Sequence, residues 1–99
     1  MSRSFRLTRR AEASLIYIAR WTFDTFGPRQ AELYEAELIE RCLSIAEGRV
    51  QSRSCAGLVE GAEDLRYLNA SEHFLVFLER SEEVIIVDIL HSRSDLPRH

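Results

Sequence analysis

The spacing of apolar residues predicts two helices in the first half of the chain. Apolar or small residues that recur at intervals of three and four mark one face of a helix. The two stripes are Ala11, Leu15, Ile18, Thr22 and Phe26, and then Ala31, Tyr34, Leu38, Cys42 and Ile45. The first helix is expected to begin after Thr8, which can cap it, and to end near Phe26; the second spans Pro28 to Glu47. Gly27 separates them, and so short a connection predicts an antiparallel helical hairpin.

Shorter patterns predict four strands around this hairpin. Ser4–Leu7 alternates polar and apolar residues, and the second half of the chain holds three more candidates, Leu65–Asn69, His73–Arg80 and Val84–His91. Residues 49–63 show no period and are expected to form a loop. The resulting order is β-α-α-β-β-β. It predicts an α+β fold in which the helical hairpin packs on one face of a small, mostly antiparallel sheet.

The last two predicted strands are apolar on both faces, which the helical hairpin alone cannot cover. Simple alternation places Leu75 and Phe77 opposite Phe74, Val76 and Leu78 in one strand, and Ile85, Val87 and Ile89 opposite Val84, Ile86 and Leu90 in the other. Ile16 and Phe23, seven residues apart, form a second apolar face on the first helix. Sheet curvature and loop 49–63 could cover these groups, but we favour cover by another polypeptide. Leaving several of them in water would cost several kcal/mol at roughly 25 cal/mol per Å².

Composition narrows the function classes. The 99 residues fit one domain, 1–99, and the 45% hydrophobic content argues against disorder. A net charge of −3 lowers the expectation of a nucleic-acid ligand, because phosphate contacts favour basic proteins. All thirteen basic residues are arginine, so no lysine can act as a catalytic amine. Two cysteines without metal-ligand spacing, and no long apolar segment, favour a soluble protein of the reducing cytoplasm.

The pattern as a whole resembles the ParE branch of the RelE/ParE toxin superfamily of type II toxin–antitoxin modules. The matching residues, in order, are Leu7-Thr8-Arg9-Arg10-Ala11, Leu15, Ile18, Phe26-Gly27, Gln30-Ala31, Tyr34, Leu65-Arg66, His73, Val76-Phe77, Ile89-Leu90-His91-Ser92-Arg93 and Asp95. The resemblance implies a RelE/ParE-like fold and a toxin neutralised by a ParD-like antitoxin, whose C-terminal segment wraps it. It further implies inhibition of DNA gyrase, with no enzymatic activity. The residues themselves hold no metal, phosphate-loop or nucleophile–base motif, so no cofactor and no metal are expected, and the net charge leads us to expect no direct sequence-specific nucleic-acid binding.

The alternative is a RelE-like, ribosome-dependent mRNA endonuclease. That reaction needs a base, an acid and cations around the scissile phosphate. Arg93 could match the C-terminal arginine of such toxins, but Phe74 stands where another arginine is expected. This chain has no lysine among its basic residues. The terminal Tyr or His of such toxins would fall at about His99. Gyrase inhibition is therefore the preferred prediction.

Two sets of candidate site residues follow. The candidates for target contact are His91, Arg93, Asp95 and Arg66, and those for antitoxin contact are Ile16, Trp21, Phe23, Phe74, Val76 and Leu78. Structural roles remain open for several of them: His91 could bond the backbone at the strand end, and Arg66 could brace the C-terminal tail. His73 is expected to face solvent. Asp88, in mid-strand, is expected to have an arginine neighbour, either Arg6 or Arg66.

Overall fold

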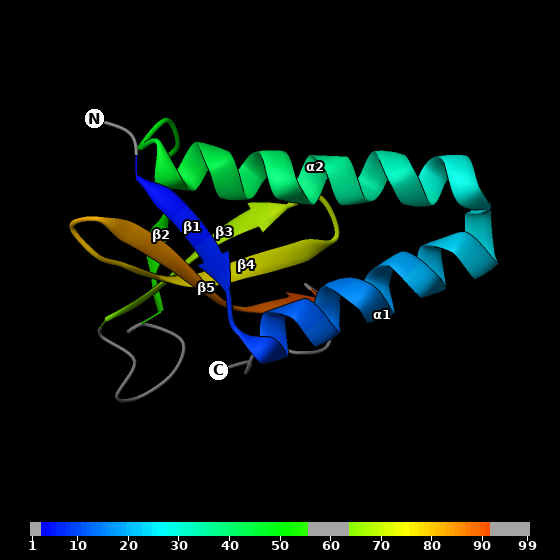
Figure 1. The fold of residues 1–99 in the computed structure, drawn as a ribbon, viewed down its shortest axis with the longest axis horizontal. Helices are drawn as coiled ribbons and strands as arrows, with labels where there is room; N and C mark the ends of the chain where they lie inside the picture. The colour runs from blue at the N-terminus through cyan, green and yellow to red at the C-terminus, as the bar shows by residue number, and fades with distance from the viewer. Residues whose placement is uncertain (1–2, 56–63, 92–99) are drawn as a thin grey trace.

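A five-stranded mixed sheet covered on one face by a helical hairpin makes up the fold (Figure 1). The computed structural model describes residues 3–55 and 64–91. The elements in chain order are β1 (Ser4–Leu7), α1 (Arg9–Phe26), α2 (Pro28–Ala46), β2 (Arg53–Ser54), β3 (Leu65–Ala70), β4 (His73–Glu79) and β5 (Glu83–His91). The strand order is β1-β5-β4-β3-β2, with β1 parallel to β5 and the other pairs antiparallel. The predicted α+β fold is confirmed, and the short β2 within the predicted loop is an addition.

Local chemistry sets the ends of the two helices. The Thr8 hydroxyl accepts the Ala11 amide at 3.1 Å, as a helix cap does, and donates to the Val87 carbonyl at 2.6 Å. One side chain therefore begins α1 and fastens it to β5. Gly27 turns the chain between the helices with φ of 95°, a backbone conformation that favours glycine. Its amide donates to the Phe23 carbonyl at 2.8 Å.

The main core lies between the helical hairpin and the sheet. Its largest fully buried side chains are Phe77, Leu38, Leu75, Ile86, Val84 and Cys42. Burial raises the pKa of the Cys42 thiol to about 12, so this side chain acts as a small apolar group. Both Cys42 and Cys55 are buried free thiols.

An irregularity in β5 changes which of its residues face the core. The register passes from Val76 opposite Asp88 to Phe77 opposite Ile86, which leaves Val87 as an extra residue. Such a bulge reverses the alternation of side chains along the strand. Val84, Ile86 and Ile89 therefore share the core, and the prediction that Ile85, Val87 and Ile89 form one face was wrong.

The other face of the sheet carries a second, smaller apolar cluster. Cys55 and Val76 are buried there, and Leu65, Tyr67 and Leu90 pack against them. Cys55 comes from the segment predicted as a loop, so the chain itself covers part of the apolar surplus on the strands. Ile16 and Phe23 on α1 stay exposed.

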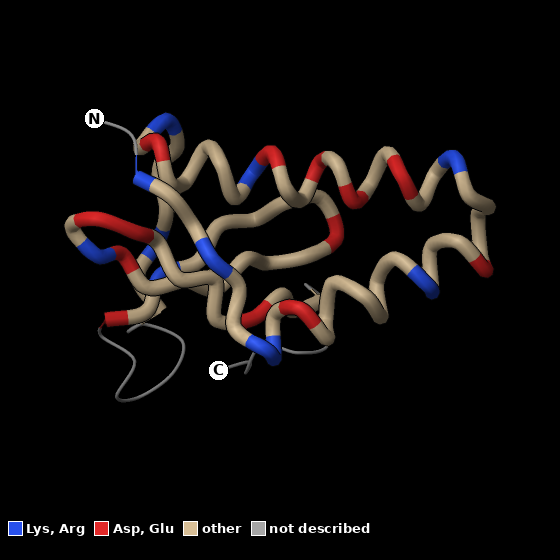
Figure 2. The backbone as a smooth tube through the Cα atoms, viewed as in Figure 1, with Lys and Arg blue, Asp and Glu red and all other residues tan. Residues whose placement is uncertain are grey.

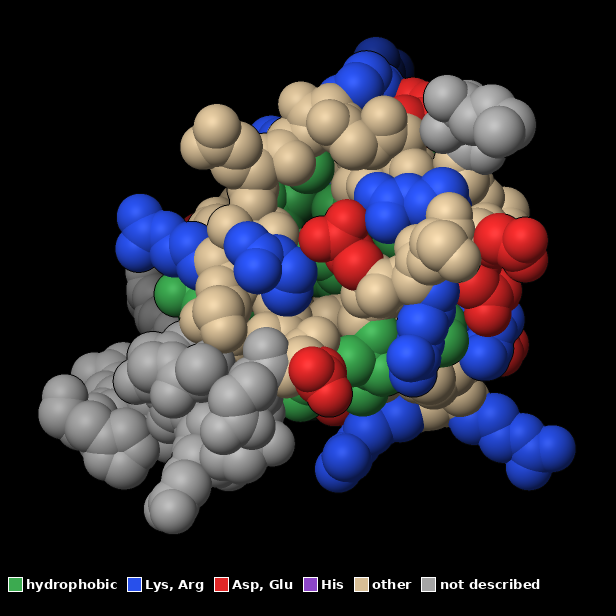
Figure 3. Space-filling view, turned by 90° about the vertical axis from the view of Figure 1, so that its left-hand side faces the viewer, with side chains coloured by type: hydrophobic (Ala, Val, Ile, Leu, Met, Phe, Trp, Pro, Cys, Tyr) green, Lys and Arg blue, Asp and Glu red, His purple; other side chains and the backbone are tan. Residues whose placement is uncertain are grey.

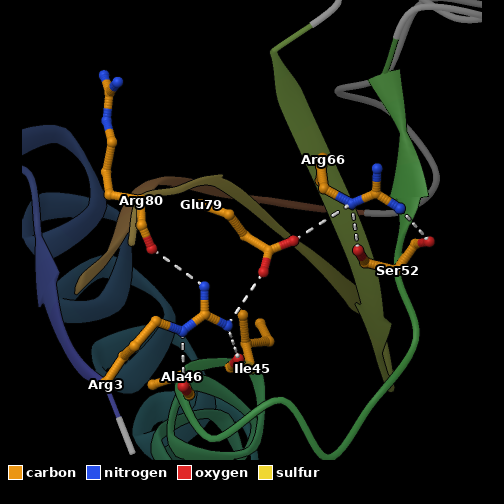
Figure 4. A network of polar contacts seen from close by, with 7 residues as sticks. All are labelled: Arg3, Ile45, Ala46, Ser52, Arg66, Glu79 and Arg80. Carbon is orange, nitrogen blue, oxygen red and sulfur yellow. Dashed lines mark hydrogen bonds and ion pairs between the residues drawn. The ribbon is translucent and has the colours of Figure 1, made fainter. Parts of the chain in front are cut away.

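A polar network fastens the sheet to the end of α2 (Figure 4). The Arg3 guanidinium donates to the carbonyls of Ala46, Ile45 and Arg80 at 3.0, 3.2 and 3.1 Å, and pairs with Glu79 at 3.0 Å. Carbonyls in the last turn of a helix lack partners within the helix, so Arg3 acts as a side-chain cap. Figure 3 shows this end of the molecule, where basic and acidic side chains are interspersed over small apolar areas.

Asp88 has an arginine neighbour, as predicted, but it is Arg10 rather than Arg6 or Arg66. The Asp88 carboxylate lies 3.4 Å from Arg10 Nε and accepts the Ser14 hydroxyl at 2.7 Å. Pairing of β1 with β5 ends at Leu7 and Ile86, so Asp88 lies beyond β1 and beside the first turns of α1. Arg6 pairs instead with Glu83.

Candidate functional site

A groove of about 1170 Å³ opens beside α1. Its walls come from α1, from the first half of α2, from the turn between β3 and β4, and from the end of β5. In Figure 1 that turn lies between the two helices. Three aromatic side chains stand in this groove with much of their surface exposed: Tyr17 at 70%, Trp21 at 52% and Phe26 at 63%.

The exposure of Phe26 corrects its predicted place in the buried stripe of the first helix. Its ring instead meets Trp21 edge-on, with ring centroids 5.9 Å apart. Because Phe26 is the last residue of α1, the sheet does not reach far enough along the hairpin to cover it. The groove wall on α1 follows its own helical spacing, Arg10, Ser14, Tyr17 and Trp21, a second stripe of which only Trp21 was predicted as a contact residue.

The floor of the groove is polar around Tyr34. Its hydroxyl lies 2.6 Å from His73 Nδ1 and accepts the Glu72 amide at 3.3 Å. Burial raises the pKa of Tyr34, and the nearby carboxylates of Glu37 and Glu72 add to the rise, whereas the Glu72 amide lowers it. Glu37 in turn accepts the Ser71 hydroxyl at 2.5 Å. These contacts hold the β3–β4 turn against α2.

Only two of the four predicted target-contact residues can be placed. His91, at the end of β5, lines the groove, and its ring meets His73 edge-on at 5.2 Å between centroids. Arg93 and Asp95 lie outside the described residues. His73 is half-buried against Tyr34, so the prediction that it faces solvent was wrong; the α2 side chain that reaches it was not visible in the strand's own pattern.

Arg66 is held in a structural network away from the groove. Its Nε and Nη2 donate to the hydroxyl and the carbonyl of Ser52 at 2.6 and 2.7 Å, and its Nε lies 3.7 Å from Glu79 (Figure 4). Glu79 also pairs with Arg3, so Arg66 belongs to the network that fastens the sheet end. It braces the segment before β2, and its role in target contact remains a prediction.

The predicted antitoxin contacts lie on three separate surfaces. Trp21 stands in the groove, whereas Ile16 and Phe23 lie on another face of α1. Phe74, Val76 and Leu78 belong to β4; Val76 is buried in the second cluster, and Phe74 is half-buried with its ring edge-on to Tyr67. One partner would have to wrap around the molecule to reach all six, so their role as a set also remains a prediction.

The groove is suited to a polypeptide better than to a phosphate group. Its aromatic walls offer apolar area, and its floor carries the carboxylates of Glu37 and Glu72. Among its described lining residues the one arginine, Arg10, is paired with Asp88. Within residues 3–55 and 64–91, no three histidine, cysteine or acidic side chains gather as a metal site would require, and no helix there is long and apolar enough to cross a membrane.

Two solved structures share this α+β fold. A chain of the "Chromosomal ParDE TA system from P. aeruginosa" superposes with a TM-score of 0.74, covering 91% of this chain and 96% of its own length at 18% identity. The hypothetical protein HP0894 from Helicobacter pylori gives 0.59, with 93% and 96% covered at 17% identity. Both likenesses concern the fold alone.

Sequence comparison then identifies the family. The family model described as "ParE toxin of type II toxin-antitoxin system, parDE" matches residues 5–96. "Toxin ParE" from Escherichia coli is 32% identical over 94 residues, covering 94% of this chain and 88% of the relative. The chain belongs to the ParE toxin family of type II toxin–antitoxin systems, which confirms the resemblance found in the sequence.

Proposed function

We propose that this ParE-family toxin is neutralised by a ParD-like antitoxin seated in the groove beside α1, and that the free toxin inhibits DNA gyrase in the cytoplasm without being an enzyme. The observation that carries the proposal is the groove itself. Tyr17, Trp21 and Phe26 are large aromatic side chains at or above half exposure along one wall. Exposed aromatic groups in a hollow are typical anchors for a bound polypeptide.

The antitoxin arm of the proposal can be tested by a charge placed in the groove. Trp21→Asp should weaken binding of the cognate antitoxin by at least about 2 kcal/mol, since burying an unpaired carboxylate adds to the loss of the ring. Leu33→Asp is a matched control, because Leu33 is 55% exposed, close to the 52% of Trp21, and does not line the groove. Titration calorimetry gives both affinities. Equal affinities for the two variants would show that the antitoxin binds elsewhere.

The gyrase arm rests on membership of the ParE family, and the described residues favour it over the nuclease. The groove brings together Tyr34, His73 and His91, which could act in proton transfer. A nuclease also needs cations for the scissile phosphate, and here Glu37 and Glu72 stand beside these groups while Arg10 is already paired. Two carboxylates next to a phosphate would raise the energy of the transition state.

One pair of assays separates the two target classes. When purified toxin is added to gyrase and supercoiled plasmid, double-stranded breaks should accumulate in the plasmid. The same toxin should leave mRNA intact in a translation extract. Cleavage of mRNA that depends on ribosomes, without plasmid breaks, would establish the nuclease instead.

The C-terminal tail supplies a test of the effector surface. Arg93→Ala should weaken both plasmid breakage and growth arrest while the antitoxin affinity stays nearly unchanged. Arg29→Ala is the control, because Arg29 lies exposed at the start of α2 and lines no part of the groove. Full toxicity of the Arg93 variant would remove the tail arginine from the effector surface.

A further inference from the structure

The outer face of the helical hairpin holds a second apolar surface that the groove does not include. Ile16 and Phe23 are 60% and 53% exposed on the side of α1 that points away from Trp21. Phe23 borders a shallow hollow of about 420 Å³ between the two helices, which is also lined by Ala31, Glu32 and Glu35 of α2. Neither the sheet nor another described segment covers this face.

The charges on this surface lie on opposite helices. Arg20 of α1 lines the hollow on one side, and Glu32 and Glu35 of α2 line it on the other. None of the three forms an ion pair with another described residue. Figure 2 shows acidic positions recurring along α2, and both helices carry charges of both signs. A surface with positive charge on one helix and negative charge on the other can complement a copy of itself.

These three residues also lie at similar positions along the axis of the hairpin, which makes the charge complementarity specific. Arg20 lies seven residues before Gly27, and Glu32 and Glu35 lie five and eight residues after it. At about 1.5 Å of rise per residue, all three side chains stand roughly 10 Å from the connection between the helices. A two-fold axis parallel to the hairpin keeps each residue at the same distance from the connection between the helices and exchanges the positions of the two helices. It therefore brings α1 of one copy against α2 of the other.

The apolar residues match under the same operation. Phe23 and Ala31 each lie four residues from Gly27, so a large ring meets a small side chain. Ile16 and Ile39 lie eleven and twelve residues from it, and Ile39 shares a face of α2 with Glu32 and Glu35. An axis across the hairpin would instead set α1 against α1 and lose the opposition of charges.

We propose that the outer face of the hairpin binds a second copy of this chain, with the two-fold axis along the hairpin. Phe23 packs over Ala31 of the other copy, Ile16 packs against Ile39, and Arg20 pairs with Glu32 and Glu35. The interface is isologous, so each contact occurs twice, and the two hairpins form a four-helix layer. The groove with Trp21 stays open in each copy, so an antitoxin seated in the groove does not block the dimer. Ile16 and Phe23 then contact the second copy instead of the antitoxin.

Sedimentation equilibrium of the full chain at several concentrations tests the proposal by charge reversal. The wild-type chain should associate to a dimer. Arg20→Glu alone should weaken the dimer at least tenfold, because like charges then face each other twice. The double variant Glu32→Arg, Glu35→Arg should weaken it similarly. All of these side chains lie on the helix surface, and circular dichroism checks that each variant is folded.

Mixing the two weakened variants gives the decisive measurement. In the heterodimer, Glu at position 20 faces two arginines, and Arg20 of the other copy faces Glu32 and Glu35. The mixture should therefore form a dimer at least tenfold tighter than either variant alone. Trp21→Asp, in the groove, should leave the wild-type dimer constant unchanged.

Three results would overturn the proposal. The first is a wild-type chain that stays monomeric at every concentration. The second is a mixture of the two variants that does not associate more tightly than each alone. The third is a dimer that Trp21→Asp disrupts and Phe23→Asp leaves intact, which would place the contact in the groove.

Discussion

The two ends of the molecule differ in their surfaces: one holds polar side chains paired within the chain, and the other holds exposed aromatic side chains. At the end shown in Figure 4, Arg3 bonds three backbone carbonyls and one carboxylate, and Arg66 bonds Ser52. At the end where the two helices connect, Trp21, Phe23 and Phe26 are all more than half exposed. At the first end the side chains of Arg3, Arg66 and Glu79 find partners within the chain, while the second end leaves large apolar groups without cover. We therefore expect stability to depend most on the sheet and the end of α2, and binding to depend most on the connected ends of the two helices.

The largest expected effect on stability belongs to the core beneath the helices. Phe77→Ala should lower the free energy of unfolding by about 3–5 kcal/mol, because Phe77 is fully buried and its loss leaves a cavity. Phe74→Ala is the matched control, since Phe74 is half-buried on the same strand. Urea denaturation measures both. A cost for Phe74 equal to that for Phe77 would mean that the open face of the sheet contributes as much as the covered one.

The polar end should give the next largest effect. Arg3→Ala should cost about 1–3 kcal/mol, because the carbonyls of Ile45 and Ala46 lose their donor and Glu79 loses a partner. Arg3→Lys should recover part of the ion pair but not the forked hydrogen bonds. The same denaturation curves measure both variants. If Arg3→Ala were neutral, the closed end would owe its stability to packing alone.

The sequence predicted the elements better than their side-chain directions. The stripes along the helices placed α1 and α2 within a residue or so of their observed ends, because local spacing carries that information. The bulge at Val87 was not predictable, since it depends on how β5 meets β4 and on the place where β1 stops. The partner of Asp88 depends on that same end of β1.

The groove was visible only in part. The exposed aromatic residues of α1 follow a helical repeat, so Trp21 could be singled out from the sequence. Tyr34 and His73 are 39 residues apart, and their contact requires the β3–β4 turn to reach α2. A contact between residues so far apart in the sequence depends on the arrangement of the whole sheet, and local sequence patterns carry no information about that arrangement.

A smaller effect on stability is expected at Tyr34, at the edge of the groove. Tyr34→Phe should cost about 1 kcal/mol, because the Glu72 amide and His73 Nδ1 lose a partner at the edge of the groove. Hydrogen exchange of the β3–β4 turn should rise in the same variant. Unchanged exchange there would mean that backbone pairing alone holds the turn.

The smallest effect on stability should come from the open end, where the effect on binding is largest. Trp21→Ala should change the free energy of unfolding by only about 0.5 kcal/mol, since half of the side chain is already exposed. The same variant should weaken binding of the antitoxin by about 2 kcal/mol or more. Leu33→Ala, equally exposed, controls for the loss of an apolar surface group. Denaturation and calorimetry on the same samples measure the two quantities. A stability loss as large as the binding loss would mean that Trp21 supports the fold, and the separation between a stabilising end and a binding end would not hold.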